Sequence, residues 1–197
     1  AALAVAAYQL CFFAGIRRTG VAVGTIMAIG SAPLIAALLA WLFLRQQPGD
    51  RWFAATLLAL AGGALIVADG GDLEAEPVGM FLAVGAGASY ALYSLLSQKI
   101  VRTVPADLAA AAVFGLGALI LLPLLFVTDQ SWLASSRGLA VALWLGLVAL
   151  ALAYVLYTRA LQSVPVGNAV TLALGEPLVA SLLGVLLLGE RLTSAAW

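Results

Sequence analysis

Chemically active side chains are scarce in the long apolar stretches of this sequence, and one carboxylate stands out among them. Glu176 lies deep within such a stretch, and Pro177 follows it directly. A charged side chain at the centre of a bilayer costs at least about 2.5 kcal/mol on insertion scales, so we expect Glu176 to face protein or water. Two interpretations stay open. Glu176 is either a polar anchor in a cavity, able to take up a proton, or a neutral acid that hydrogen-bonds to a neighbouring helix.

Two prolines occupy comparable places in the apolar stretches. Pro33 and Pro177 each remove a backbone N–H donor, which frees the carbonyl four residues earlier, at Ile29 and Ala173. This pattern favours a hinge, or backbone acceptors that face a cavity. The alternative is an ordinary proline kink, which membrane helices tolerate.

Tyrosines occur in two pairs, and the members of each pair lie about one helical turn apart. The pairs are Tyr90 with Tyr93 and Tyr154 with Tyr157. A tyrosine in a cavity supplies an aromatic wall with a hydroxyl at its tip. We therefore expect Tyr90 and Tyr154, the deeper members, to line a cavity, and Tyr157, beside Arg159, to lie at the membrane interface.

A polar and small-residue stripe runs along the stretch that holds Glu176. Asn168, Thr171 and Gly175 fall on it at helical spacing, and we expect Thr171 to border the cavity. The small residues at 85–89 indicate close helix packing instead. The predicted substrate-binding residues are Tyr90, Tyr154, Thr171 and Glu176, and the predicted hinges are Pro33 and Pro177.

Composition excludes several classes of protein. Hydrophobic residues make up 64% of the chain and charged residues 9%, whereas globular domains hold about 45–50% and about 25%. Nine basic and nine acidic side chains give no net charge, which argues against nucleic acid as a partner. Without histidine, histidine-based triads and two-histidine zinc motifs are impossible. We therefore predict no catalytic residue, no metal and no cofactor, and the chain is not predicted to be an enzyme.

The apolar stretches predict an all-α, polytopic bundle of transmembrane helices that forms a single domain over residues 1–197. Six of the seven stretches reach the length of about 17–25 residues that a spanning helix needs. They show neither the polar face of a soluble helix nor the alternation of a barrel strand. The stretches are residues 1–16, 21–44, 52–68, 78–98, 106–127, 138–158 and 166–188.

An internal repeat relates the two ends of the chain. Pro33 and Pro177 lie 144 positions apart, and Trp52 and Trp197 lie 145 apart. The displacement is five stretches, an odd number, so the two copies must cross the membrane in opposite directions, as in inverted-repeat transporters. We expect residues 8–52 to superpose on 154–197 after a rotation of about 180° about an axis in the membrane plane. A unit then has five helices, and this chain holds helices three to nine of ten.

Several short motifs recur along the apolar stretches. They are Ala32-Pro33-Leu34, Leu42-Phe43-Leu44, Gly87-Ala88-Ser89-Tyr90-Ala91, Tyr154-Val155-Leu156-Tyr157, Ala160-Leu161-Gln162, Glu176-Pro177-Leu178 and Leu187-Leu188-Gly189-Glu190-Arg191-Leu192. In their order and spacing these motifs resemble the EamA-type families of the drug/metabolite transporter superfamily. The first half departs from the family pattern at Arg45-Gln46-Gln47, where Gly-Glu-Arg is usual.

The resemblance implies a secondary transporter of amino acids, metabolites or drugs, in the inner membrane of a bacterium, that works by alternating access without ATP. Residues 1–68 would then end the first EamA repeat, and 78–197 would form the second repeat without its last helix. The implied partners are a small-molecule substrate and the lipid bilayer, and proton coupling and a homodimer stay open.

Two alternatives remain. A nucleotide-sugar or sugar-phosphate carrier of the same superfamily would need buried basic residues, but every Arg and Lys lies at or near the end of an apolar stretch. A non-transporting membrane scaffold would have no use for two proline-broken helices.

Overall fold

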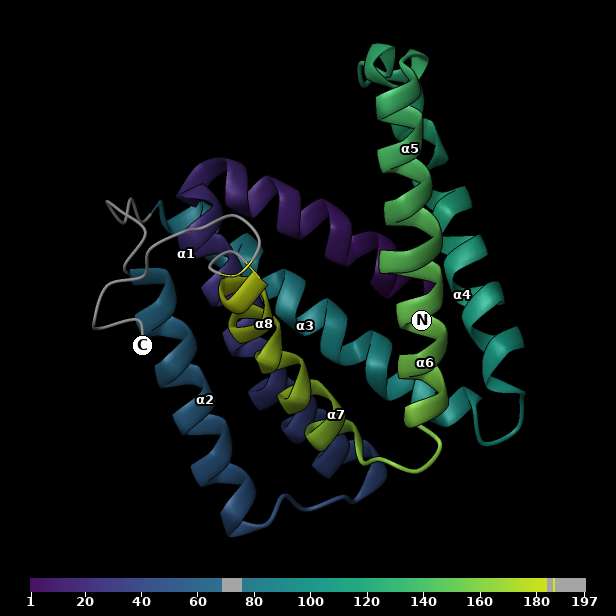
Figure 1. The fold of residues 1–197 in the computed structure, drawn as a ribbon. Helices are drawn as coiled ribbons and strands as arrows, with labels where there is room; N and C mark the ends of the chain where they lie inside the picture. The colour runs from purple at the N-terminus through teal and green to yellow at the C-terminus, as the bar shows by residue number, and fades with distance from the viewer. Residues whose placement is uncertain (69–75, 184–185, 187–197) are drawn as a thin grey trace.

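The chain forms a bundle of helices, because a backbone in lipid must satisfy its hydrogen bonds internally. The computed structural model describes residues 1–68, 76–183 and 186, and every regular element in this part is helical (Figure 1). The elements are α1 (Ala2–Leu44), α2 (Asp50–Ala68), α3 (Pro77–Ile100), α4 (Ala106–Leu121), η1 (Leu122–Phe126), η2 (Ser131–Ala134), α5 (Ser136–Trp144), η3 (Leu145–Leu152), α6 (Ala153–Ala160), α7 (Val166–Leu172), η4 (Ala173–Gly175) and α8 (Glu176–Leu183).

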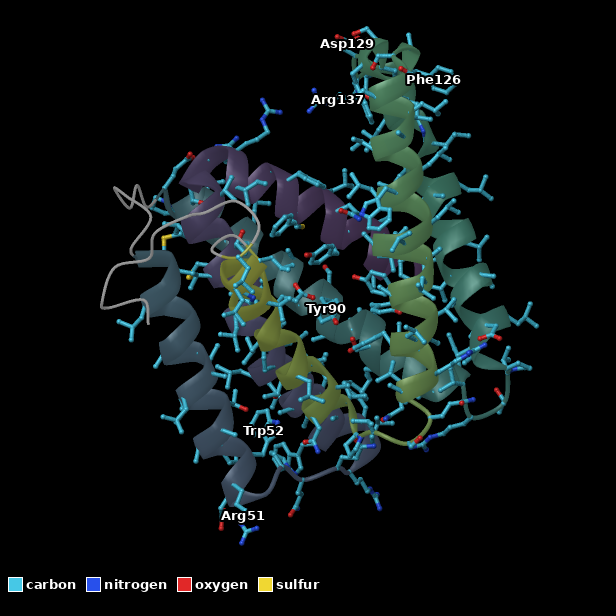
Figure 2. The ribbon with its side chains drawn as sticks, in the orientation of Figure 1. Arg51, Trp52, Tyr90, Phe126, Asp129 and Arg137 are labelled. Carbon is cyan, nitrogen blue, oxygen red and sulfur yellow. The ribbon has the colours of Figure 1, made fainter. Side chains whose placement is uncertain are left out.

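Four segments of the described residues are long and apolar enough to cross a membrane, which confirms the predicted polytopic bundle. The last of them joins α5, η3 and α6, and its middle part has π-helical geometry. Figure 2 places Arg51 at one end of the molecule and Asp129 at the opposite end, as charged side chains require in a membrane. The four segments are Val23–Leu44, Pro77–Ile100, Ala106–Phe126 and Ser136–Ala160.

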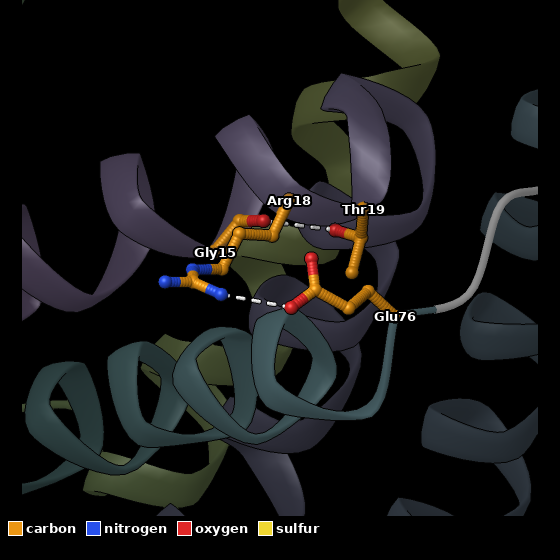
Figure 3. A network of polar contacts seen from close by, with 4 residues as sticks. All are labelled: Gly15, Arg18, Thr19 and Glu76. Atoms are coloured by element: carbon orange, nitrogen blue, oxygen red, sulfur yellow. Dashed lines mark hydrogen bonds and ion pairs between the residues drawn. The ribbon is translucent and has the colours of Figure 1, made fainter.

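A sharp turn at Gly20 divides α1 into two arms that run in different directions (Figure 1). Gly20 has φ 77° and ψ 160°, a conformation that a residue with a Cβ adopts only with strain. Arg18 pairs with Glu76 at this turn, with 2.8 Å between Nη1 and Oε1 (Figure 3). Both side chains are at least 41% exposed, so the pair contributes only about 0–1 kcal/mol and mainly holds the start of α3 beside the turn.

Helix α3 packs closely against both arms of α1. A Cβ at Gly15 would lie 3.1 Å from the Gly79 carbonyl oxygen, and one at Gly87 would lie 2.6 Å from the Ala28 carbonyl oxygen. Only glycine permits two backbones to approach so closely. The close packing predicted for the small residues at 85–89 is therefore confirmed at Gly87.

The second arm of α1 lies antiparallel to α7 and α8 (Figure 1). A Cβ at Gly167 would lie 3.9 Å from the Ala37 Cβ. Ala28 lies nine positions before Ala37, and Glu176 lies nine positions after Gly167. Ala28 and Glu176 line the same cavity. The helices with Pro33 and Pro177 thus run in opposite directions, as the odd displacement of the repeat requires. The superposition of 8–52 on 154–197 stays a prediction, because the end of span 166–188, the motif at 187–192 and Trp197 lie outside the described residues.

A short connector that includes η2 lies between η1 and α5. Asp129 accepts hydrogen bonds from the backbone N–H and the hydroxyl of Ser131, at 2.8 and 3.0 Å. These hydrogen bonds, first the one from the backbone, lower the pKa of the Asp129 carboxyl. Ser135 caps α5 by accepting a hydrogen bond from the Gly138 N–H at 3.0 Å. The connector therefore has its own local hydrogen bonds.

Candidate functional site

A polar cavity lies where α1, α3, α6 and the α7–α8 segment meet. It has a volume of about 100 Å³. A wider groove of about 330 Å³ adjoins it and shares Tyr90, Tyr154, Ala173 and Glu176 with it. Figure 2 shows Tyr90 near the centre of the molecule. The residues that line the cavity are Tyr8, Ala28, Ile29, Ala32, Tyr90, Tyr154, Val170, Ala173 and Glu176.

All five tyrosines of the chain belong to one aromatic cluster around this cavity. The ring centroids of Tyr8 and Tyr90 lie 6.1 Å apart, and those of Tyr90 and Tyr157 lie 5.9 Å apart. On the other side, Tyr93 lies 5.8 Å from Tyr154 in an edge-to-face arrangement. Aromatic pairs at these distances stabilise one another beyond the area they bury. The cluster therefore gives the cavity an aromatic wall.

Hydrogen bonds fix two of these tyrosine side chains. The hydroxyls of Tyr157 and Ser94 are 2.8 Å apart, and those of Tyr93 and Thr158 are 3.4 Å apart. Tyr93 and Ser94 lie on α3, whereas Tyr157 and Thr158 lie on α6, so these contacts also join the two helices. The wall of the cavity is thus tied to the packing of α3 against α6.

Glu176 is positioned by a break in its helix. The α-helical turns of α7 tighten into the short turn η4 at Ala173–Gly175, and α8 then begins at Glu176. Pro177 has no N–H for the Ala173 carbonyl, which explains why regular α-helical bonding stops there. Ala173 and Ile29, the residues whose carbonyls the two prolines free, both line the cavity. The two proline positions of the repeat therefore converge on one site.

The Glu176 side chain borders open space rather than the packed interior. The residue is exposed and lines both the cavity and the groove. In the described part of the chain, its carboxylate has no hydrogen-bonding or ion-pair partner within contact distance. Such a carboxylate is available to a solute, a proton or water.

The structure brings three of the four predicted substrate-binding residues together, namely Tyr90, Tyr154 and Glu176. Thr171 lies elsewhere. Its hydroxyl donates to the Gly167 carbonyl at 2.8 Å and accepts from the Trp52 indole N–H at 2.9 Å, so it joins α7 to α2. Five positions separate Thr171 from Glu176, which at about 100° per residue places them about 140° apart around a helix.

The two predicted hinges differ in their surroundings. Pro177 follows the irregular turn at Ala173–Gly175. Pro33 is fully buried inside the second arm of α1, where the backbone stays helical. A hinge role at both prolines stays a prediction.

Two tyrosines lie at positions that differ from those the sequence indicates. The interface position expected for Tyr157 is wrong, because its ring packs in the tyrosine cluster and its hydroxyl contacts Ser94. Its neighbour Arg159 suggested the membrane surface, but α6 carries the two side chains on different faces. Tyr8 lines the cavity and was not expected. The repeat held the signal, since Tyr8 begins the first predicted copy as Tyr154 begins the second.

Fold and cavity together define a polytopic helical membrane protein with a polar, aromatic cavity between antiparallel helices. The chain belongs to the EamA-like transporter family, whose sequence pattern matches residues 1–68 and 77–197. It is 46% identical over its full length to a Bacillus subtilis protein named "Uncharacterized transporter YwfM". It is 32% identical over 169 residues, 83% of the chain, to the Escherichia coli K12 protein named "Threonine/homoserine exporter RhtA".

A crystal structure with 22% sequence identity has the same fold, with a TM-score of 0.82 over 96% of this chain. The chain spans 66% of that structure, 67% of the Bacillus relative and 53% of the Escherichia relative. Part of each relative therefore has no counterpart in this chain.

Proposed function

We propose that the complete protein is a secondary transporter that moves small organic solutes across the membrane by alternating access, and that the tyrosine-lined cavity is its substrate site. The observation that carries this proposal is the convergence of Ile29 and Ala173, one from each proline-containing helix, on the cavity with Glu176. Inverted-repeat transporters bind their substrates where interrupted helices of the two repeats meet. A scaffold has no need of such a cavity.

The lining favours solutes without phosphate. Carriers of nucleotide sugars or sugar phosphates need basic residues to bind phosphate, and the described lining of cavity and groove holds no Arg or Lys. The relative named as a threonine/homoserine exporter supports small amino acids and related metabolites as solutes, and export as the direction. We place the protein in the inner membrane of a bacterium, as a carrier and not as a catalyst.

Transport by the full-length protein in proteoliposomes tests this proposal. Vesicles with and without the protein are loaded with single radiolabelled amino acids, amines or sugar phosphates, and efflux is followed with and without a proton gradient. We expect saturable efflux of at least one amino acid or amine, above that of protein-free vesicles, and none of the sugar phosphates. Trp132→Phe, at an exposed position in η2 far from the cavity, serves as the control variant. Efflux that equals the protein-free level for every solute overturns the proposal.

A further inference from the structure

The described lining of the cavity has an acidic side chain and no basic one. In the described lining of cavity and groove, Glu176 is the one carboxylate, and the remaining polar side chains there are the hydroxyls of Tyr8, Tyr90, Tyr154 and Tyr157. The other lining residues are small or aliphatic. An ionised Glu176 would therefore give the cavity a negative potential, which nothing in the described lining neutralises.

The basic side chains of the described residues lie away from the cavity. Arg159 makes two hydrogen bonds to Asp107, at 2.7 and 2.6 Å, across the ends of α6 and α4. Lys99 lies over the Phe43 ring, 5.7 Å from its centroid. Arg18 pairs with Glu76 at the turn of α1. The other described arginines are all exposed: Arg17, Arg45, Arg51, Arg102 and Arg137.

A carboxylate surrounded by tyrosine rings suits a cation. Opposite charges attract more strongly where apolar walls displace water. An ammonium group is also attracted to the faces of aromatic rings within about 6 Å, and this attraction grows when the group loses its water. An anion would gain neither interaction and would be repelled by Glu176. We propose that Glu176 and the rings of Tyr8, Tyr90 and Tyr154 form a subsite for the ammonium group of the solute. This inference rests on the proposed function, because it names the chemistry of the same cavity.

The site consists of a small cavity and a wider groove, and each fits a different part of the solute. The cavity of about 100 Å³ holds Glu176 and three tyrosines and fits a head group. The adjoining groove of about 330 Å³ adds Ala149, Ala153 and Leu172, and so provides apolar walls for the rest of the solute. A solute with an ammonium group next to an apolar body matches both parts. Simple amines and zwitterionic amino acids share this chemistry.

Binding of four probes with one apolar body separates the charge types. The probes are 2-phenylethylamine, a cation; L-phenylalanine, a zwitterion; N-acetyl-2-phenylethylamine, which is neutral; and 3-phenylpropionate, an anion. Affinity for the purified full-length protein in nanodiscs is measured by isothermal titration calorimetry. We expect the amine or the amino acid to bind at least about tenfold more tightly than the neutral and anionic probes. Preference for the amine identifies amines as the source of the ammonium group, and preference for phenylalanine identifies amino acids.

Three variants assign the binding to named groups. Glu176→Gln keeps the shape of the side chain, and we expect it to weaken ammonium binding about tenfold or more. Tyr154→Leu removes a ring while Tyr154→Phe keeps it, so binding should fall in the first and persist in the second. Size-exclusion chromatography checks the fold of each variant. Equal affinity for all four probes, or ammonium binding unchanged in Glu176→Gln, overturns the subsite. If Tyr154→Phe weakens binding as much as Tyr154→Leu does, the aromatic part of the subsite is wrong.

Different experimental results would contradict the ammonium subsite and the proposed transport function. If proteoliposomes transport neutral solutes and the protein does not bind the amine or the amino acid, the ammonium subsite is wrong and transport stands. If the protein binds the amine in a Glu176-dependent way and no solute is transported, the subsite stands and the proposed function is wrong.

Discussion

At the residue scale, Glu176 is the group with the clearest chemical role. Its carboxylate borders a cavity whose other described polar side chains are those of tyrosines, and tyrosine titrates only near pH 10 in water. We therefore predict that Glu176→Gln lowers transport about tenfold or more and changes its dependence on pH. Gln keeps the shape and hydrogen bonding of Glu but cannot titrate. The measurement is efflux from proteoliposomes at several pH values, normalised to the amount of protein.

Glu176→Leu, compared with Glu176→Gln, distinguishes a role of the Glu176 charge in transport from a role of its side chain in helix packing. If Glu176→Gln transports normally across the pH range while Glu176→Leu is unstable, the side chain serves as a hydrogen-bonding group between helices. This outcome would select the structural interpretation of Glu176 over the interpretation as a substrate or proton site.

The sequence predicted part of this site for a physical reason. Glu176, Tyr90 and Tyr154 lie in apolar stretches where contact with lipid is unfavourable, so an inward position follows from the residue type. Thr171 is short and can hydrogen-bond to its own helix at Gly167, so its type does not fix its direction. Tyr8 reaches the cavity through the turn at Gly20 and the packing of α1 on α3. Contacts between segments that lie far apart in the sequence cannot be predicted from the spacing of residues along one helix.

At the element scale, a buried glutamine joins three segments of the bundle. Gln98 on α3, 5% exposed, donates to the carbonyls of Leu161 and Val164, at 3.2 and 2.8 Å. Its own carbonyl oxygen accepts from the Gln46 side chain at 3.0 Å. These bonds link the end of α3 to the connector between α6 and α7 and to the connector after α1.

We predict that Gln98→Leu destabilises the protein by about 1–3 kcal/mol, because it leaves buried carbonyl groups without donors. Gln162→Leu is the matched control, since Gln162 is exposed and lies on the connector between α6 and α7 to which Gln98 donates. The measurement is the temperature of unfolding in detergent. An equal effect of the two substitutions would show that the hydrogen bonds of Gln98 contribute little to stability.

Two glycines of α3 test the close packing of this helix on α1. A Cβ at Gly87 would lie 2.6 Å from the Ala28 carbonyl oxygen, whereas one at Gly85 would lie at an ordinary 3.6 Å from the Cys11 sulfur. Both substitutions by alanine favour the helix by up to about 1 kcal/mol. We expect Gly87→Ala to destabilise the protein by about 1–3 kcal/mol and Gly85→Ala to leave it unchanged or more stable. Thermal unfolding of both variants in detergent provides the comparison, and a stable Gly87→Ala would contradict the close contact.

At the scale of the whole molecule, the sequence predicted the class of fold well because two strong constraints act on it. The length of the apolar stretches is set by the thickness of the membrane, and the odd displacement between the copies sets their relative direction. The sequence does not show which helices pack against one another. The irregular turn at Ala173–Gly175 and the π-helical stretch at Leu145–Leu152 were likewise not predicted, because they are local departures from helices that the sequence indicates as continuous.

The antiparallel packing of the two proline-containing helices can be tested by a disulfide. Ala37 and Gly167 lie on facing helices, and their Cβ positions are 3.9 Å apart, within the range of about 3.5–4.5 Å that a disulfide needs. We predict that Ala37→Cys with Gly167→Cys cross-links on mild oxidation in a Cys11→Ala background. Ala28→Cys with Gly167→Cys should not, because nine helical positions displace Ala28 from Ala37 by about 13 Å. The cross-link is read as a shift in gel mobility after cleavage of a protease site inserted between the two helices. If only the second pair cross-links, the helices do not pack in the described register.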